Sequence, residues 1–243
     1  MKVAVLTDIH SNLPALEAVL EAIDESKPDA RWCLGDVVGY GAQPDQCAEL
    51  ASEKTDLCLV GNHDLAVTGE IDTEVFSASA AAAVDWTKEN TEEKTMTFLK
   101  GLKPEASEQD VGLYHASPRD PVWEYVLAVD QARECMQEQS GRVSLIGHSH
   151  VALYFSDSDE DKNAGGQAPD GHELDLSEGR WLLNPGSVGQ PRDGDPRAAW
   201  LELDTDAWKA TYHRVEYEID KAAEAIREAG LPDLLADRLY VGQ

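Results

Sequence analysis

Five short segments of this sequence place aspartate, asparagine and histidine residues directly after apolar, strand-like runs. They are Asp8-Ile9-His10, Gly35-Asp36, Gly61-Asn62-His63-Asp64, Tyr114-His115 and Gly147-His148-Ser149-His150. Five of the seven histidines of the chain lie in these segments, and only His172 and His213 do not. Because α/β proteins form their sites beyond the carboxyl ends of strands, this sorting of the histidines indicates one shared site.

The chemistry suggested by these residue types is metal binding. Asp8 and His10 are two residues apart at a strand end, so their side chains point to the same side. Mixed oxygen and nitrogen ligands suit Mn²⁺, Fe²⁺ or Zn²⁺ better than Ca²⁺. Taken alone, this pair is more typical of a helix-capping aspartate beside a turn histidine, so the interpretation depends on the other segments.

The spacing of the segments strengthens the metal interpretation. An interval of 26 residues separates His10 from Asp36, and the same interval separates Asp36 from Asn62. Each interval matches about one strand–helix unit, so the three segments are expected on adjacent strand tips. The candidate ligands are Asp8, His10, Asp36, Asn62, His115, His148 and His150. That set exceeds the needs of one ion and matches two ions about 3.5–4 Å apart that share a carboxylate.

The charge of the chain limits its partners. Acidic residues outnumber basic residues 47 to 20, which gives a formal net charge of −27. Such a surface repels nucleic acids and anionic membranes, so neither duplex nucleic acid nor a membrane is an expected partner. Two divalent ions would nevertheless leave the site itself positive, because bound ions dominate the local field. The charge of the site therefore favours an anionic substrate, and the net charge of the chain does not exclude a phosphate ligand.

The order of the predicted elements favours a single α/β domain over residues 1–243. Strands are predicted over residues 2–7, 30–34 and 57–60, with a helix capped by Ser11 and another over 45–52 between them. Further helices are predicted over 73–90, 92–102, 130–139 and 219–229. Strand-like runs over 111–114, 143–146, 151–155, 181–184, 198–203 and 210–215 indicate a second, more antiparallel sheet in the later half of the chain.

Three further features concern mobility and compartment. The acidic, glycine-rich residues 156–179 are interpreted as a flexible insertion within the domain. No apolar run is long enough to span a membrane, and no signal peptide is visible. The four cysteines form no CxxC pair, and Cys33 and Cys58 lie in strand-like runs. We therefore expect buried thiols and a cytoplasmic protein.

The ordered blocks DIH, GDVVGYG, GNHD, YHASP and GHSH resemble those of the calcineurin-like metallophosphoesterases, over Met1 to about Arg214. The resemblance implies a four-layer α/β/β/α sandwich with a dinuclear metal site at the strand ends. It implies a first ion held by Asp8, His10, Asp36 and His150, and a second held by Asp36, Asn62, His115 and His148. It also implies that His63 faces the scissile phosphate without binding metal and that Asp64 orients His63. Mn²⁺ is the first candidate ion, with Fe²⁺, Ni²⁺ and Zn²⁺ as alternatives.

The longer segments around these blocks resemble small prokaryotic phosphodiesterases and dinucleoside polyphosphate hydrolases. This implies a phosphohydrolase that cleaves phosphodiester or phosphoanhydride bonds of nucleotide-like substrates by metal-activated hydroxide. Arg119 and Arg192 are candidates for contact with a second phosphate, and Tyr40 is a candidate for stacking on a ring. The alternatives are ion-paired surface arginines and a tyrosine that packs in the core.

A second class of function shares the same fold. The retromer scaffold subunit of eukaryotes resembles these enzymes but acts through its surfaces, so a metal-stabilised protein-binding scaffold is the alternative function. A scaffold could lose His63 or a metal ligand without penalty, whereas every expected position is filled in this chain. Catalysis is therefore favoured. The family ranges from monomers to tetramers, so a homo-oligomer is compatible with the resemblance.

The even spread of acidic residues predicts that stability depends on salt. At molar salt the screening length falls to about 3 Å, which removes most repulsion between carboxylates. We expect a protein from a salt-accumulating halophile, with a Tm that rises steeply with KCl. Thermal unfolding from about 0.1 M to several molar KCl tests this expectation. A flat Tm over that range would contradict it.

Overall fold

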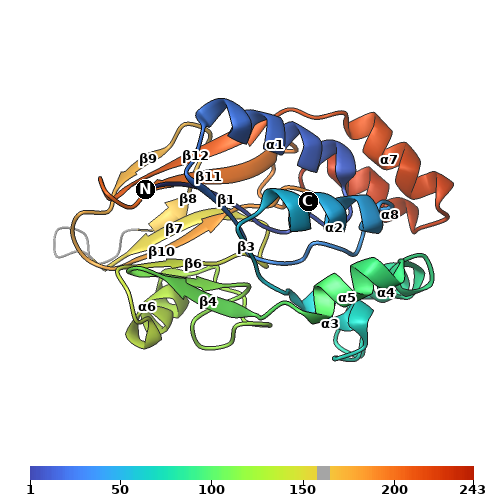
Figure 1. The fold of residues 1–243 in the computed structure, drawn as a ribbon, viewed down its shortest axis with the longest axis horizontal. Helices are drawn as coiled ribbons and strands as arrows, with labels where there is room; N and C mark the ends of the chain where they lie inside the picture. Colours follow the sequence, from blue (N-terminus) through green and yellow to red (C-terminus); the bar gives the residue numbers. More distant parts are fainter. Residues whose placement is uncertain (158–164) are drawn as a thin grey trace.

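The computed structural model describes residues 1–157 and 165–243 and folds them into two mixed sheets flanked by helices (Figure 1). The first sheet contains, in spatial order, β3 (Leu57–Cys58), β2 (Ala30–Cys33), β1 (Lys2–Leu6), β11 (Ala198–Asp204), β12 (Lys209–Val215) and β9 (Glu173–Asp175). The second contains β4 (Glu105–Glu108), β5 (Val111–Tyr114), β6 (Val143–Leu145), β10 (Trp181–Pro185), β7 (Ala152–Ser156) and β8 (Gly165–Gln167). Strands β1, β2 and β3 are parallel to one another, as are β5, β6 and β10, so in each sheet several carboxyl ends share one edge.

The described helices pack on the outer faces of the two sheets and around the site. They are α1 (Leu13–Ser26), α2 (Pro44–Lys54), α3 (Asn62–Thr68), α4 (Ala78–Glu89), α5 (Glu93–Lys100), α6 (Val129–Glu138), α7 (Ile219–Glu228) and α8 (Asp233–Asp237), with a 3-10 turn at Arg238–Tyr240. None of the described helices is long and apolar enough to cross a membrane. In Figure 1, α1 runs along the first sheet and α6 lies against the second.

Alternation along the strands divides the core into layers. Ala4 and Leu6 of β1 face the cluster that contains α1 and α2, whereas Val3 and Val5 face the second sheet, where Leu145 is one of their neighbours. Successive strand residues point to opposite faces, so one strand supplies both layers. A further cluster packs α6 on the outer face of the second sheet. The predicted four-layer α/β/β/α sandwich is confirmed.

The structure corrects the predicted start of the first helix. Asn12, and not Ser11, is the cap of α1, and its Oδ1 accepts a hydrogen bond from the backbone nitrogen of Ala15 at 3.2 Å. Ser11 has a φ of 53°, in the left-handed region, and belongs to the turn before the helix. The chain must turn sharply after the strand before it can enter the helix, and a cap rule applied to sequence does not include that turn.

The division of strands between the sheets also differs from the prediction. Strands β11 and β12 join the first sheet, because β11 pairs antiparallel with β1 in the register Val3↔Leu203. Within the predicted insertion over 156–179, residues 158–164 lie outside the described residues. The described part contributes the edge strand β8 to the second sheet and β9 to the first, where a loop was expected. The charged and glycine-rich composition of this segment gives no strand pattern in the sequence, because these short strands depend on pairing with neighbouring strands.

Three cysteines are buried as expected, namely Cys33, Cys47 and Cys135, while Cys58 is only half-buried. All four are free thiols. Cys33 and Cys58 are register partners across β2 and β3. Burial raises the pKa of Cys135 to about 11, so this thiol stays protonated near neutral pH.

A buried ion pair fastens the loop that follows β10. Arg214 of β12 pairs with Asp193, and their side chains are only 4% and 3% exposed. Asp193 also accepts a hydrogen bond from the backbone nitrogen of Ala152 at 3.0 Å. This carboxylate therefore connects the loop to β12 and β7.

We expect Arg214→Met to lower the free energy of unfolding by about 3–5 kcal/mol, because it leaves the Asp193 charge buried without a partner. Chemical denaturation measures the loss. Arg227→Met is the matched control, since the Arg227–Asp237 pair is exposed and its removal should change stability little. Equal effects of the two substitutions would contradict the structural role of the buried pair.

Candidate metal centre

All seven predicted ligands converge beyond the carboxyl ends of the strands. Asp8 and His10 follow β1, Asp36 follows β2, Asn62 begins α3, His115 follows β5, and His148 and His150 follow β6. Each of these side chains is buried, with at most 3% of its surface exposed. The strands that precede Asp8, Asp36 and Asn62 are neighbours in the first sheet, and His115, His148 and His150 follow strands of the second sheet.

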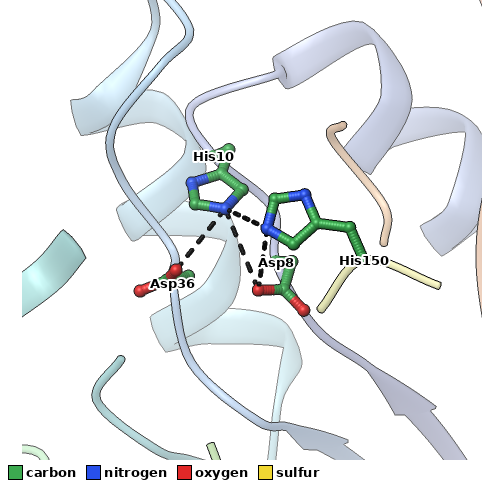
Figure 2. A group of neighbouring side chains, drawn as sticks. All are labelled: Asp8, His10, Asp36 and His150. Carbon is green, nitrogen blue, oxygen red and sulfur yellow. Dashed lines mark hydrogen bonds and ion pairs between the residues drawn. The ribbon is translucent and has the colours of Figure 1, made fainter. Parts of the chain in front are cut away.

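The first group joins Asp8, His10, Asp36 and His150, whose ligand atoms all lie within 4.8 Å of one another (Figure 2). His10 Nε2 lies 3.5 Å from Asp36 Oδ2 and 3.0 Å from His150 Nε2. His150 Nε2 lies 3.3 Å from Asp8 Oδ1. Four potential ligand atoms therefore surround one small volume.

The hydrogen bonds of the two histidines reveal which ring nitrogens are free. His10 Nδ1 lies 3.1 Å from the carbonyl oxygen of Val38, and His150 Nδ1 lies 2.7 Å from that of Gln190. A carbonyl oxygen only accepts, so each Nδ1 carries the proton and each Nε2 presents a lone pair. Two lone pairs 3.0 Å apart repel each other. A cation between them removes this repulsion, so the donor set fits a metal ion.

The carboxylates fit the same ion. Asp8 Oδ1 and Asp36 Oδ2 are buried and have no hydrogen-bond partner within the described part of the chain. The second oxygen of Asp8 accepts from Thr7 Oγ1 at 2.9 Å and from the backbone nitrogen of His148 at 3.0 Å. Each carboxylate thus has one oxygen held by the protein and one oxygen left for a ligand.

The second group joins Asp36, His115 and His148, with Asn62 beside them. His115 Nδ1 lies 2.9 Å from the carbonyl oxygen of Leu34, so its Nε2 is the free nitrogen. That Nε2 lies 3.1 Å from Asn62 Oδ1 and 3.6 Å from Asp36 Oδ2. His148 Nε2 is buried without a partner among the described residues. Asp36 belongs to both groups, which is the arrangement that a bridging carboxylate requires.

The backbone around these ligands is strained. Positive φ angles between 50° and 63° occur at five ligand positions, namely Asp8, His10, Asp36, His148 and His150. Residues with a Cβ rarely adopt this left-handed region, and such strain concentrates at functional sites. Gly61 adds a close approach, because a Cβ at that position would collide with Asp36 Oδ1.

Burial shifts the titration of every ionisable ligand. It raises the pKa of Asp8 to about 6 and raises the pKa of Asp36 well above its usual range, where Asp64 and Asp8 add repulsion. Burial also lowers the pKa of His10 and His148 well below the usual histidine value. The histidines are therefore neutral near pH 7, which is the form that binds metal.

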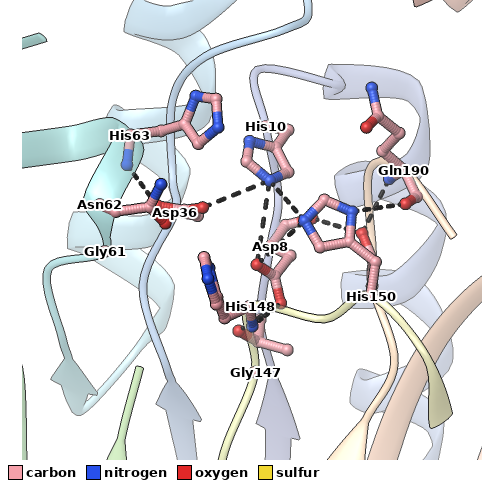
Figure 3. A network of polar contacts seen from close by, with 12 residues as sticks. Asp8, His10, Asp36, Gly61, Asn62, His63, Gly147, His148, His150 and Gln190 are labelled. Carbon is pink, nitrogen blue, oxygen red and sulfur yellow. Dashed lines mark hydrogen bonds and ion pairs between the residues drawn. The ribbon is translucent and has the colours of Figure 1, made fainter. Parts of the chain in front are cut away.

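His63 lies beside the ligands without belonging to either group (Figure 3). Its ring centroid is 4.9 Å from that of His10 and 4.3 Å from that of Tyr40. Its backbone nitrogen donates to Asp36 Oδ1 at 2.8 Å. Burial lowers the pKa of His63 well below its usual value, so the imidazole is neutral near pH 7.

The Asp64 carboxylate is held by backbone nitrogens. Its Oδ1 accepts from the backbone nitrogen of Val38 at 3.0 Å, and its Oδ2 accepts from that of Gly61 at 2.9 Å. In the described structure these bonds, and not a bond to the His63 ring, occupy the carboxylate. Asp64 is the third residue of α3 and reaches back to the helix cap, so it fixes two ligand-bearing loops.

The candidate substrate residues fall into two environments. The Arg192 guanidinium lies 5.5 Å from the centre of the Tyr40 ring, and the Tyr40 ring lies 4.7 Å from that of His10. Arg192 forms no ion pair with the described residues, and its Nε is buried without a partner. Arg119, by contrast, is ion-paired with Glu124 and Glu134. Arg192 and Tyr40 thus lie together near the ligands, whereas the Arg119 guanidinium is already paired with two glutamates.

Sequence reasoning missed several residues around the centre. The Tyr125 ring stacks at 4.0 Å from the ring of His148, and Phe76 lies 4.9 Å from His63. Arg238 is close enough to Arg192 that this second guanidinium, after burial, lowers its pKa. Tyr125 follows the YHASP block closely enough to have been a candidate. Phe76 and Arg238 carry no local signal, because only the tertiary fold brings them near.

Comparisons with known proteins agree with this geometry. The calcineurin-like phosphoesterase superfamily domain matches residues 1–206. An uncharacterized protein of Methanocaldococcus jannaschii is 38% identical over 99% of this chain and 98% of its own length. The crystal structure of a metallophosphoesterase from Sphaerobacter thermophilus superposes with a TM-score of 0.90 at 38% identity, covering 100% of this chain and 99% of that one. A hypothetical protein from Pyrococcus horikoshii OT3 shares the fold, with a TM-score of 0.81 at 20% identity over 100% of this chain and 98% of its own.

The titration of the ligands predicts how metal binding depends on pH. We expect Mn²⁺ to raise Tm strongly at pH 8, and we expect this rise to shrink as the pH falls through about 6. Protons that occupy Asp8 and Asp36 must be displaced before an ion can bind, so the ion loses to protons at low pH. Thermal unfolding with and without Mn²⁺ measures the difference.

Asp36→Asn is the companion test, because it removes charge from the one carboxylate shared by both groups. Metal content after gel filtration should fall from two ions per chain to less than one. A Tm rise independent of pH, or two ions retained by Asp36→Asn, would contradict the ligand assignment.

Proposed function

The chain belongs to the calcineurin-like phosphoesterase superfamily, and on that premise we propose that it is a dinuclear-metal-dependent phosphohydrolase. Its proposed substrates are small, nucleotide-like molecules with phosphodiester or phosphoanhydride bonds. The observation that carries the proposal is that Asp36 lies in both ligand groups while its Oδ2 has no partner among the described residues. Such a carboxylate suits two ions that act on one phosphate.

Asp8, His10, Asp36 and His150 would hold one ion, and Asp36, Asn62, His115 and His148 would hold the other. When bound, two divalent ions supply positive charge and acidify a water molecule for attack on phosphorus. Mn²⁺ is our first candidate, with Fe²⁺, Ni²⁺ and Zn²⁺ as alternatives. The residues themselves supply rigidity, because His10, His115 and His150 are each held by a backbone carbonyl. Both aspartates are held by backbone or side-chain donors.

His63 is the proposed proton donor to the departing oxygen. Its Nδ1 packs on the backbone of Gly39, where a Cβ would lie only 2.6 Å away, so Nε2 is the nitrogen available to the substrate. A negative phosphate group bound beside His63 would favour the protonated imidazolium, which donates this proton to the departing oxygen and is left neutral. The hydrogen bond from the backbone nitrogen of His63 to Asp36 ties its position to the metal ligands.

Arg192 is the proposed anion-binding residue, with Tyr40 as its support. Seven of the ten arginines pair with a carboxylate among the described residues, namely Arg31, Arg119, Arg133, Arg180, Arg197, Arg214 and Arg227. In so acidic a chain, an unpaired guanidinium beside the centre is a deviation that suits a phosphate group. Arg238 next to Arg192 adds a second positive charge. An anionic substrate would relieve the repulsion between them.

We expect His63→Ala to retain its metal and to lower kcat by about 10²–10⁴-fold, as loss of a general acid does. The assay adds Mn²⁺ to metal-stripped protein in high KCl and follows a 2′,3′-cyclic nucleotide, whose departing alkoxide oxygen needs a proton. His172→Ala is the matched control, because its imidazole lies in neither ligand group. Unchanged turnover of His63→Ala would remove His63 from the reaction.

The same assay separates catalysis from a scaffold function. Wild-type protein that binds two ions, remains folded and hydrolyses neither bis-p-nitrophenyl phosphate, p-nitrophenyl phosphate, a 2′,3′-cyclic nucleotide nor a dinucleoside tetraphosphate would contradict the enzyme proposal. That outcome would support a metal-stabilised protein-binding scaffold.

A further inference from the structure

A groove of about 600 Å³ adjoins the metal centre and has no part in the chemistry described above. It is lined by Glu70, Ile71, Asp72, Val75 and Trp123, from the segment between α3 and α4 and from the loop after β5. Its volume lies within the range of about 300–1,000 Å³ that is usual for small-molecule sites. The groove is open, so a ligand could enter directly from solvent.

Aromatic rings connect this groove to His63. The Trp123 ring that lines the groove lies 5.4 Å from the ring of Phe76, in an edge-on arrangement. Phe76 in turn lies 4.9 Å from His63, and Trp123 lies 6.5 Å from His148. A group that leaves the phosphate beside His63 would therefore meet a continuous aromatic wall that leads into the groove.

The lining of the groove specifies the kind of group that it accepts. Ile71, Val75 and Trp123 provide apolar surface, and Val75 is 74% exposed. Glu70 and Asp72 place two carboxylates at the same groove. These carboxylates repel phosphate but accept hydrogen bonds from hydroxyl or amino groups.

Positive charge is found near His63 as well, outside the groove. Tyr40 lies 4.3 Å from His63, with Arg192 over the Tyr40 ring and Arg238 nearby. The surroundings of Arg192 are therefore suited to anions, and the groove at Trp123 is suited to a neutral, flat group. A substrate whose two ends differ in this way would be held in one orientation.

We propose that the groove binds the departing alcohol of the substrate, and that this alcohol is uncharged and carries a flat aromatic ring. The inference rests on the proposed function and narrows its substrate class to phosphodiesters with a neutral leaving group. Water forms the new P–O bond, the ester P–O bond breaks, and the departing oxygen takes its proton from His63. The products are the free alcohol and a phosphate monoester. A nucleoside and an aryl alcohol share this chemistry.

Direct binding tests the groove independently of turnover. The probes are adenosine, phenol and orthophosphate, added to ¹⁵N-labelled, Zn²⁺-loaded protein while the indole N–H signals of the six tryptophans are recorded. Trp123→Phe and Trp208→Phe identify the signals of these two tryptophans. We expect adenosine or phenol, or both, to shift the Trp123 signal without shifting that of Trp208, and the larger shift identifies whether a nucleoside or an aryl ring is the better ligand. A Trp123 signal moved by neither ring compound, or moved equally by orthophosphate, would overturn the proposal.

Kinetics test the same groove in the working enzyme. Trp123→Ala should lower kcat/KM about tenfold for a dinucleoside monophosphate, with a smaller effect on ADP, whose leaving group is anionic. Trp208→Ala is the matched control, because this half-buried tryptophan lies in the turn between β11 and β12. The double substitution E70Q/D72N should raise the rate on ADP relative to the dinucleoside monophosphate. Equal changes on all substrates would overturn the proposal.

The two experiments fail in different ways. If the wild-type protein binds two ions but hydrolyses no phosphate ester, the proposed function fails, and the Trp123 signal still decides whether the groove takes a neutral ring. If hydrolysis occurs and Trp123→Ala behaves like Trp208→Ala, only the assignment of the groove fails.

Discussion

Lone pairs forced together in a buried space are the constraint on which this structure depends. His10 and His150 direct Nε2 atoms at each other from 3.0 Å, and the free oxygens of Asp8 and Asp36 face the same volume. Without positive charge this arrangement is repulsive. Burial further destabilises the two ionised carboxylates, which raises the pKa of both groups. The surrounding hydrogen bonds and left-handed turns hold the ligands in place, so the folding energy of two sheets stabilises a site that opposes folding.

The net charge of the chain is negative, whereas the surroundings of the metal centre include positive charge. The chain as a whole carries −27, yet the groups nearest the metal centre include Arg192 and Arg238 without side-chain carboxylate partners among the described residues. A strongly acidic exterior would repel nucleic acids and other polyanions, while the local positive charge would suit the small phosphate ester of the proposed function. The acidic groove at Trp123 adds a third environment. On the proposed function, these charges would favour one substrate orientation over its reverse.

Local patterns in the sequence predicted most of the strands and helices, and they failed where long-range pairing decided the outcome. Strand β11 was assigned to the second sheet, although its backbone pairs with β1 from the other end of the chain. The resemblance implies that Asp64 orients His63, and only the fold shows which groups its carboxylate bonds. It accepts from the backbone nitrogen of Gly61, at the cap of α3, and from that of Val38, in the loop after β2.

The sequence by itself determined the family, the four-layer fold and the set of residues that meet at the strand ends. Motif spacing matches the strand–helix repeat, and the carboxyl ends of parallel strands share an edge, so local order was enough to predict that convergence. Only the tertiary structure decided which ring nitrogens are free, which of the two candidate arginines stays unpaired, and which aromatic side chains surround His63. Those properties depend on contacts between residues as distant in sequence as Tyr40, Arg192 and Arg238, and no local pattern encodes such contacts.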